Sequence, residues 1–301
     1  MSEPLRVTVQ TAGRVDKELA RQFPGASRRR LAEMFEHGYV RIAGKRANKG
    51  DRVEPGDLIE LTHAPITGDA AQPAPDPAAA AQLIVLVERI DVIAICKPAG
   101  MPSQPLRAGE HGTAASGIVH TWPECAKIGD DSRDGGLVHR LDIGTSGVLV
   151  AARTPERYRA LRNAFGAGLI DKTYLAICDN RPVSRECDAP LAQRGRHVVV
   201  DHTDGLPAFT AFTVERATAT HSLVRCTSQT GRMHQVRAHL AHVGSPIVGD
   251  TLYGGAALPG IQGFFLHASS ITIPLDSERL TIEAPIPQRF TDALIRCGLG
   301  A

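Results

Sequence analysis

Residues Gly135–Arg153 read GGLVHRLDIGTSGVLVAAR, and within them Asp142 occupies a polar turn between two short apolar runs. The run from Val148 to Ala151 is continuously apolar, which predicts a fully buried strand. The carboxylate is therefore expected where the apolar core meets a surface loop, a position that often carries functional side chains. From this stretch alone, a structural turn or helix-cap aspartate explains Asp142 equally well.

Six further short motifs lie in order along the chain on either side of this stretch. They are KPAG at 97–100, KTY at 172–174, TGRMHQVRAHL at 230–240, GDTLYG at 249–254, LHA at 266–268 and EAPIP at 283–287. Together with HRLD at 139–142, they resemble the motifs of the RluA-like pseudouridine synthases, enzymes that isomerise uridine to pseudouridine within RNA. The resemblance covers roughly Leu86 to Pro287, and an ordered set of motifs is far more specific than any one of them.

The resemblance implies a fold class and a domain layout. It implies an α+β catalytic domain at 83–301, built on a mixed, largely antiparallel sheet with the active cleft along one face. The segment 63–82 is rich in Pro and Ala and has no apolar period, so we expect a linker that is semi-rigid where its prolines are closely spaced. An ordered loop on the surface is the alternative interpretation of this segment.

Three catalytic residues follow from the resemblance. Asp142 matches the family's catalytic aspartate, and a carboxyl group with an unperturbed pKa near about 3.9 is already ionised at neutral pH. Arg237 matches the arginine that pairs with that aspartate and would keep it ionised in a partly dry pocket. Tyr174 matches the active-site tyrosine, whose ring can stack on the target base. Without the motifs, Arg237 could be a solvent-facing helix residue and Tyr174 a core residue.

The same motifs imply contacts to the substrate. Arg140 corresponds to the arginine that enters the space left when the target base is extruded from the stack. Lys97 is expected to organise the cleft near RNA phosphates. Arg232, His234 and Gln235, from the motif at 230–240, are expected to bind substrate as well. His139, beside the catalytic motif, is interpreted as a structural histidine.

The implied reaction needs no cofactor, because it breaks one glycosidic bond and forms a carbon–carbon bond without net oxidation or hydrolysis. We therefore expect neither a metal nor a nucleotide cofactor. A metal-hydrolase cluster of His234, His239, His242 and Asp250 is a competing interpretation. The spacing disfavours it, because His234 and His239 are five residues apart, about 140° around a helix, whereas metal ligands on one helix face are three or four apart.

The basic residues of the chain are concentrated near its N-terminus. Of the 34 Lys and Arg and 32 Asp and Glu, residues 1–62 hold twelve and nine, so the remaining 239 residues hold 22 and 23. A helix is predicted from Ser27, its N-cap, to Gly38. Arg28, Arg29 and Arg30 lie in its first turn, where cations oppose the helix dipole. This arrangement costs stability unless a phosphate is the intended neighbour of the three arginines. The order of two helices, a basic hairpin with Lys45 and a strand resembles the RNA-binding domain named after ribosomal protein S-four, which implies an RNA-binding module at 1–62.

Composition is compatible with such an enzyme but does not identify it. The 301 residues are 43% apolar, and no run approaches the ~18 to 20 apolar residues of a membrane span. The first ten residues lack the apolar core of a secretory signal, so a cytoplasmic protein is expected. The six cysteines form no CxxC pair, which indicates reduced and mostly buried thiols.

The most favoured function is a pseudouridine synthase that acts on large-subunit ribosomal RNA, as a monomer with RNA as its partner. Transfer RNA is the alternative substrate, because other relatives modify it, although family members of this layout mostly act on large-subunit ribosomal RNA. An RNA-binding assembly factor without activity is a third hypothesis, and the intact set of Asp142, Tyr174 and Arg237 argues against it.

Overall fold

The computed structural model describes residues 4–23, 26, 28–63, 72–107, 109–276 and 278–300. An N-terminal module up to residue 63 contains two helices, α1 (Val15–Gln22) and α2 (Arg28–Glu36). Its short strands pair antiparallel in two small sheets. They follow the orders β1 (Leu5–Thr8), β6 (Leu58–Leu61), β3 (Val40–Ile42), β4 (Lys45–Arg46), and β2 (Gly13–Arg14), β5 (Arg52–Val53).

The apolar faces of the two helices form the core of this module. Val15 and Leu19 of α1, and Leu31 and Phe35 of α2, are spaced four residues apart, so each pair lies on one helix face. All four are buried, and they pack in one cluster with Ile59 of β6. The predicted order of helix, helix, hairpin and strand is confirmed. The predicted N-cap at residue 27 lies outside the described residues.

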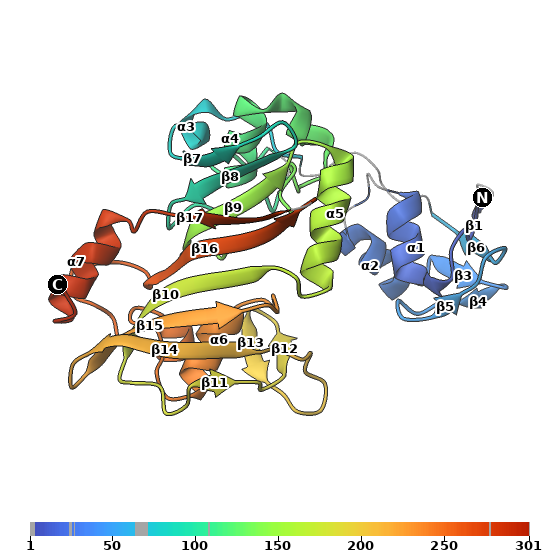
Figure 1. The fold of residues 1–301 in the computed structure, drawn as a ribbon. Helices are drawn as coiled ribbons and strands as arrows, with labels where there is room; N and C mark the ends of the chain where they lie inside the picture. The colour runs from blue at the N-terminus through green and yellow to red at the C-terminus, as the bar shows by residue number, and fades with distance from the viewer. Residues whose placement is uncertain are drawn as a thin grey trace.

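A mixed sheet forms the framework of the rest of the chain (Figure 1). Its strands lie in the order β11-β14-β15-β10-β16-β9-β8-β7, with β17 paired to β16, and β16 and β9 run parallel while the other neighbouring strands run antiparallel. The mixed, largely antiparallel sheet is confirmed. The strands are β7 (Ile84–Glu88), β8 (Val92–Lys97), β9 (Ser146–Ala152), β10 (Asp171–Asp179), β11 (Glu186–Cys187), β14 (Thr210–Ala217), β15 (His221–Ser228), β16 (Leu266–Leu275) and β17 (Glu278–Glu283), and β12 (Leu191–Arg194) and β13 (His197–Val200) form a separate hairpin.

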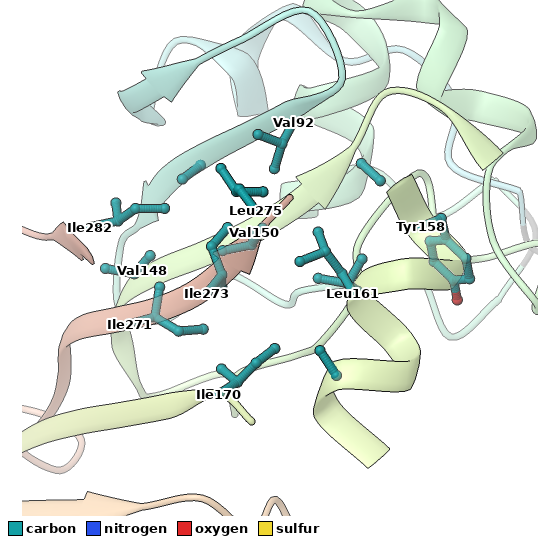
Figure 2. Packing of buried hydrophobic residues seen from close by; sticks show 14 of the residues in the cluster. Val92, Val148, Val150, Tyr158, Leu161, Ile170, Ile271, Ile273, Leu275 and Ile282 are labelled. Atoms are coloured by element: carbon teal, nitrogen blue, oxygen red, sulfur yellow. The ribbon is translucent and has the colours of Figure 1, made fainter. Parts of the chain in front are cut away.

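Helices cover both sides of this sheet. They are α4 (Ala114–Thr121), α5 (Pro155–Gly166), α6 (Gln235–His242) and α7 (Gln288–Arg296), with short 3-10 turns at Pro123–Lys127 and Thr251–Tyr253. On one side, Val92, Val148 and Val150 pack with Leu161 of α5 and Ile273 of β16 (Figure 2). The alternate residues of β8 and β9 pack against α4 on the other side. Because both faces are covered, residues 92–96 of β8 and 148–152 of β9 are apolar without interruption, as predicted for 148–151.

Strand β10 shows the same alternation and carries Tyr174, one of the three predicted catalytic residues. Ala176 and Cys178 pack toward α6, whereas Leu175 and Ile177 pack toward α7. Tyr174 lies two residues before Ala176, so its side chain points to the same face, where it contacts the clusters under both α4 and α6.

The segment predicted to be a linker is structured in its second half. Within residues 72–82, α3 (Pro77–Ala80) is capped by Asp76, whose carboxylate accepts hydrogen bonds from the N–H groups of Ala78 and Ala79. The Ala79 side chain is buried in the cluster of α4, so α3 packs on the catalytic domain. The sequence concealed this helix because Pro and Ala suit both a linker and a capped helical turn. Residues 64–71 lie outside the described part.

Two further expectations concern the whole chain. All six cysteines are buried and are free thiols, as their scattered positions predicted. Within the described part of the chain, no helix is long and apolar enough to cross a membrane.

Candidate active site

The loop after the KPAG motif holds the turn that carries Asp142. Ser103 Oγ donates to the Leu141 carbonyl at 2.8 Å and accepts from the Leu141 N–H at 3.0 Å. Beyond the aspartate, the Ile143 carbonyl accepts from the Gly100 N–H at 2.7 Å. The backbone is therefore fixed on both sides of Asp142, which restricts the directions that its carboxylate can take.

Lys97 lies inside this loop and does not reach the surface, so the expected contact with RNA phosphates is wrong. Its side chain is 0% exposed, and Nζ donates to the carbonyls of Pro98, Met101 and Ile143 at 3.0, 2.7 and 3.2 Å. Both faces of β8 are covered, which turns the side chain inward. Burial lowers the pKa of Lys97 to about 7, because the ammonium group loses its hydration. The lysine joins the loop to the turn.

Arg237 bridges two carboxylates at the base of the cleft. Its Nη1 donates to Asp142 Oδ2 at 2.9 Å, while Nε and Nη2 bind both oxygens of Asp250 at 2.7 and 2.8 Å. The expected contact with Asp142 is present, but the planar fork faces Asp250 and leaves a single bond for Asp142. Burial by itself would lower the pKa of Arg237, but the hydrogen bonds to Asp250 and the negative charge of Asp250 outweigh this effect. The pKa of Arg237 is therefore raised, and the guanidinium stays charged.

Two aromatic rings enclose the guanidinium of Arg237. Its carbon lies 5.0 Å from the ring centre of Tyr253 and 4.4 Å from that of Phe264, within the range of a cation–π contact. The Phe264 ring also packs on the turn of Asp142, because a Cβ at Gly144 would lie only 2.6 Å from Phe264 Cε1. Phe264 therefore contacts both elements that form the Asp142–Arg237 pair.

His234 lies at the N-cap of α6 in a left-handed backbone conformation, with φ of 52°. Its Nδ1 is 2.9 Å from the Tyr253 hydroxyl, and its Nε2 is 3.7 Å from Asp142 Oδ1. The hydroxyl accepts from the Val198 N–H at 3.0 Å, so its own proton is available to Nδ1. Burial lowers the pKa of His234, which favours a neutral ring with its Nε2–H toward Asp142. This proton assignment follows from the hydrogen-bond network.

The three predicted catalytic residues line one small cavity of about 70 Å³. Arg140, which is exposed, and Arg232 also line it. A wider cleft of about 540 Å³ shares Asp142, Tyr174 and Arg140 with this cavity and extends to α5. Burial raises the pKa of Tyr174, so its hydroxyl stays protonated at neutral pH.

Gln235 lines the same cavity and also supports the site through hydrogen bonds within the protein, so its expected contact with substrate stays a prediction. Its side-chain oxygen accepts from Thr230 Oγ1 at 2.9 Å and from the Arg232 N–H at 3.1 Å. Its amide nitrogen donates to the Phe209 carbonyl and to Ser228 Oγ. The side chain is buried, and these bonds fix the loop 228–234 that presents Arg232.

The histidines of the metal-hydrolase interpretation do not converge. His239 is buried, and its ring nitrogens lie 2.9 Å from Thr210 Oγ1 and from the Ala189 carbonyl. Among the described residues, no three metal-binding side chains gather in one place. His139 accepts a hydrogen bond from the Val150 N–H, in keeping with the structural role predicted for it.

The predicted RNA-binding residues of the N-terminal module lie outside this cavity. Arg28, Arg29 and Arg30 form the first turn of α2, as expected, but their side chains lie outside the described part. Lys45 is exposed on β4 at the hairpin.

Comparison with known proteins identifies the two parts of the chain. A model of the RNA pseudouridylate synthase family matches residues 91–242, and a model of the S4 domain matches residues 13–59. The chain belongs to the RNA pseudouridylate synthase family. It is therefore an RNA pseudouridine synthase, an isomerase that acts on RNA and carries an N-terminal S4 domain.

Relatives share most of its length. A "Ribosomal large subunit pseudouridine synthase D" of Xanthomonas campestris is 33% identical, over 97% of this chain and 95% of the relative. An "Uncharacterized RNA pseudouridine synthase" of Chloroflexus aurantiacus is 35% identical, over 92% of this chain and 88% of the relative. The solved structure of "Human RNA Pseudouridylate Synthase Domain Containing 4" matches with a TM-score of 0.57 at 22% identity, over 71% of this chain and 92% of that one. This last similarity shows the fold.

Proposed function

We propose that this enzyme converts specific uridines of large-subunit ribosomal RNA to pseudouridine, with Asp142 as its catalytic carboxylate. The observation that carries the proposal is the position of Asp142. Its carboxylate is 25% exposed at the floor of the cavity, it is bonded to the buried guanidinium of Arg237, and it faces the half-buried ring of Tyr174 across the same cavity.

The bond changes define what these groups must do. The bond from the sugar C1′ to N1 of the base breaks, the base turns, C1′ bonds to C5, the C5 proton leaves and N1 gains a proton. Asp142 acts at the sugar, either as a nucleophile on the sugar carbon or as a base toward a sugar proton, and both routes need the ionised carboxylate. Arg237 stabilises the negative charge of the Asp142 carboxylate. The Nε2–H group of His234, which points toward Asp142, stabilises this charge further.

The remaining residues of the cavity hold the extruded base. The Tyr174 ring packs on the uracil, and its protonated hydroxyl assists proton transfer. Arg140, exposed at the rim, fills the gap in the RNA stack and recovers part of the few kcal/mol that base extrusion costs. Arg232, presented by the loop that Gln235 fixes, contacts the RNA strand beside the target.

The names of the relatives support the proposed substrate class. Those from Xanthomonas campestris and Xylella fastidiosa are named for the large ribosomal subunit and align over nearly the whole of this chain. The S4 domain supplies a second RNA contact, tethered to the first. The proposal includes a monomeric enzyme in the cytoplasm.

Wild-type and Asp142→Asn protein test the proposal on unmodified large-subunit ribosomal RNA and on transfer RNA, with pseudouridine mapped afterwards. We expect the wild type to modify discrete uridines of the ribosomal RNA, and the variant to retain less than a few per cent of the rate with unchanged RNA affinity. Asp204→Asn, which changes an exposed carboxylate outside the cavity, is the matched control. Conversion of transfer RNA alone would refute the substrate class, and an active Asp142→Asn protein would refute the role of Asp142.

A further inference from the structure

The wide cleft extends well beyond the space around Asp142. Its volume of about 540 Å³ far exceeds the cavity of about 70 Å³ at the carboxylate, and it reaches along α5. We call this extension the α5 limb and define it by His139, Arg162, Phe165, Lys172 and Asp130, all of which line the cleft. The proposed function places the target base in the cavity at Asp142, so the α5 limb is available to another part of the substrate.

Lys172 places a nearly buried positive charge in this limb. The residue is 7% exposed, and its Nζ donates to the Thr230 carbonyl at 2.5 Å. Among the described residues, no carboxylate forms an ion pair with it. Burial, together with the nearby charge of Arg232, lowers the pKa of Lys172 to about 8. Buried charges in proteins are usually paired, so an anion supplied by the substrate would complete this site.

Arg162 adds a second cation that is held only loosely. Its Nη1 donates to the Val138 carbonyl at 3.0 Å, which directs the guanidinium toward the cleft. Its Nε lies 3.9 Å from Asp130 Oδ2, and both side chains are about half exposed or more. An exposed pair at this distance is weak, so a phosphate can replace the carboxylate.

The other acidic side chains of the cleft are engaged elsewhere. Asp131 binds Arg133 through two bonds of 2.9 and 2.8 Å. Asp134 accepts from the Tyr158 hydroxyl and from Gln104 Nε2, both at 2.7 Å. Their charge is therefore balanced or hydrogen-bonded, and Asp130 remains the carboxylate that competes with an anion for Arg162.

Between the two cations lies a surface of rings. The ring centres of His139 and Phe165 are 5.1 Å apart, and Lys172 Nζ is 5.9 Å from the centre of Phe165. Burial, with the charges of Lys172 and Arg162, lowers the pKa of His139 to about 3, so its ring is neutral at physiological pH. Two neutral rings flanked by two cations are complementary to a base and its phosphate.

We propose that the α5 limb is a second nucleotide subsite, in which Arg162 and Lys172 bind a backbone phosphate beside the target uridine while the rings of Phe165 and His139 contact the neighbouring base. The inference rests on the proposed function, because it assumes that the target uridine lies at Asp142. It adds an assignment that the catalytic motifs do not contain, namely a role for α5 in binding RNA.

The test is a cycle of paired changes in protein and RNA. A short uridine-containing RNA hairpin is prepared with each phosphate near the uridine replaced in turn by a neutral methylphosphonate, and affinity is measured for the wild type and for Arg162→Ala. At one position we expect neutralisation to weaken the wild type about tenfold, as for the removal of one charge-assisted hydrogen bond, and to weaken Arg162→Ala clearly less, because only Lys172 then binds that phosphate.

Two further variants sharpen the result. Arg159→Ala removes a cation from the same helix that pairs with Glu156 and does not line the cleft, and we expect no change in affinity. Asp130→Asn removes the competing carboxylate, and we expect RNA to bind two- to threefold more tightly. Because this exposed substitution keeps the shape of the side chain, it also tests the subsite if Arg162→Ala is destabilised.

The subsite is refuted if no phosphate shows coupling to Arg162, or if Arg159→Ala weakens binding as much as Arg162→Ala does. Binding needs no turnover, so this result is independent of the chemistry. Pseudouridine formation by the wild type, measured on large-subunit ribosomal RNA, separates the two failures: a protein that converts the RNA but shows no coupling refutes only the subsite.

Discussion

The turn around Asp142 and the α5 limb of the cleft are built in opposite ways. Around Asp142, the neighbouring backbone groups are hydrogen-bonded to the loop 97–103, among others to the buried hydroxyl of Ser103. In the α5 limb, Arg162 and Asp130 are exposed and lie 3.9 Å apart. A carboxylate that acts at the sugar by either route gains from a site that need not reorganise. A cation that binds an RNA strand can instead exchange a weakly bound carboxylate for a phosphate, as proposed for Arg162 and Asp130.

The largest effect on the reaction rate should follow from Arg237→Met, which removes the cation paired with Asp142. Asp142 and Asp250 would then face each other without a guanidinium, and removal of one partner from a buried ion pair costs about 3–5 kcal/mol. We expect the single-turnover rate to fall at least a hundredfold. Arg237→Lys keeps the charge but cannot form the two-bond contact with Asp250. Its rate should therefore lie between those of the wild type and Arg237→Met. A rate above a tenth of the wild type in Arg237→Met would show that Asp142 does not depend on this pair.

Ser103→Ala should have the next largest effect, because it removes the hydroxyl that binds both backbone groups of Leu141. A buried polar group left unpaired costs about 1–3 kcal/mol. We expect kcat to fall about tenfold with KM nearly unchanged, since the substrate does not touch this positioning residue. Ser103→Thr keeps the hydroxyl and should restore most of the rate. A rise in KM without a fall in kcat would contradict the positioning role.

These residues show what the sequence could predict and what it could not. The local motifs located Asp142, Tyr174 and Arg237, which the structure brings into one cavity, and their catalytic roles stay predictions. Ser103 and Phe264 were missed, because their contacts to 141–144 depend on the packing of distant segments. The run GFFLHA offered one signal, since two aromatic residues precede a motif that had already been recognised.

Burial explains why the interpretation of Lys97 failed. Lys97 belongs to a motif of an RNA enzyme, so a place near RNA phosphates was the natural expectation. A motif specifies residue type and order but not the direction of a side chain, and the Lys97 side chain is fully buried. Asp250 was noted only as a possible metal ligand, and its two-bond contact with Arg237 emerges only from the folded chain.

Phe264→Leu tests whether the ring that packs on Arg237 and Gly144 helps to hold the Asp142–Arg237 pair in place. We expect a fall of about fivefold in the single-turnover rate, because the change removes a cation–π interaction of roughly 0.5–2 kcal/mol while most apolar packing remains. Gly144→Ala should be harmful in the wild type, where the new Cβ meets the ring, and better tolerated beside Phe264→Leu. Additive effects of the two changes would show that the ring does not couple these positions.

Lys97 should make stability depend on pH. Its folded pKa, about 7, lies below the unfolded value, so between these pH values the unfolded chain binds more protons. The penalty for burying the ammonium is fully present below pH 7 and is relieved as the pH rises toward 10. The free energy of unfolding should therefore gain up to about 1.4 kcal/mol per pH unit from this group. Denaturant titrations of the wild type and Lys97→Met should differ by this slope, and parallel curves would contradict it.

The smallest effect on chemistry is expected from the basic residues of the S4 domain. Arg28, Arg29, Arg30 and Lys45 are changed together to Ala. Arg46 is left in place, because its guanidinium donates to the carbonyls of residues 35 and 36 at the end of α2 and so supports the fold. For each RNA phosphate that the variant no longer binds, the log–log slope of affinity against salt should decrease by about 0.7 to 0.9.

The single-turnover rate at saturating RNA should change little in this variant, because tethering adds affinity through effective concentration without altering the groups around Asp142. Binding is measured across a salt series for both proteins, alongside conversion of the same RNA. An unchanged salt slope would mean that these side chains do not bind phosphates. A collapsed saturating rate would mean that the module helps to form the active site, and the contrast between a rigid centre for chemistry and adaptable surfaces for RNA would then have to include the S4 domain on the rigid side.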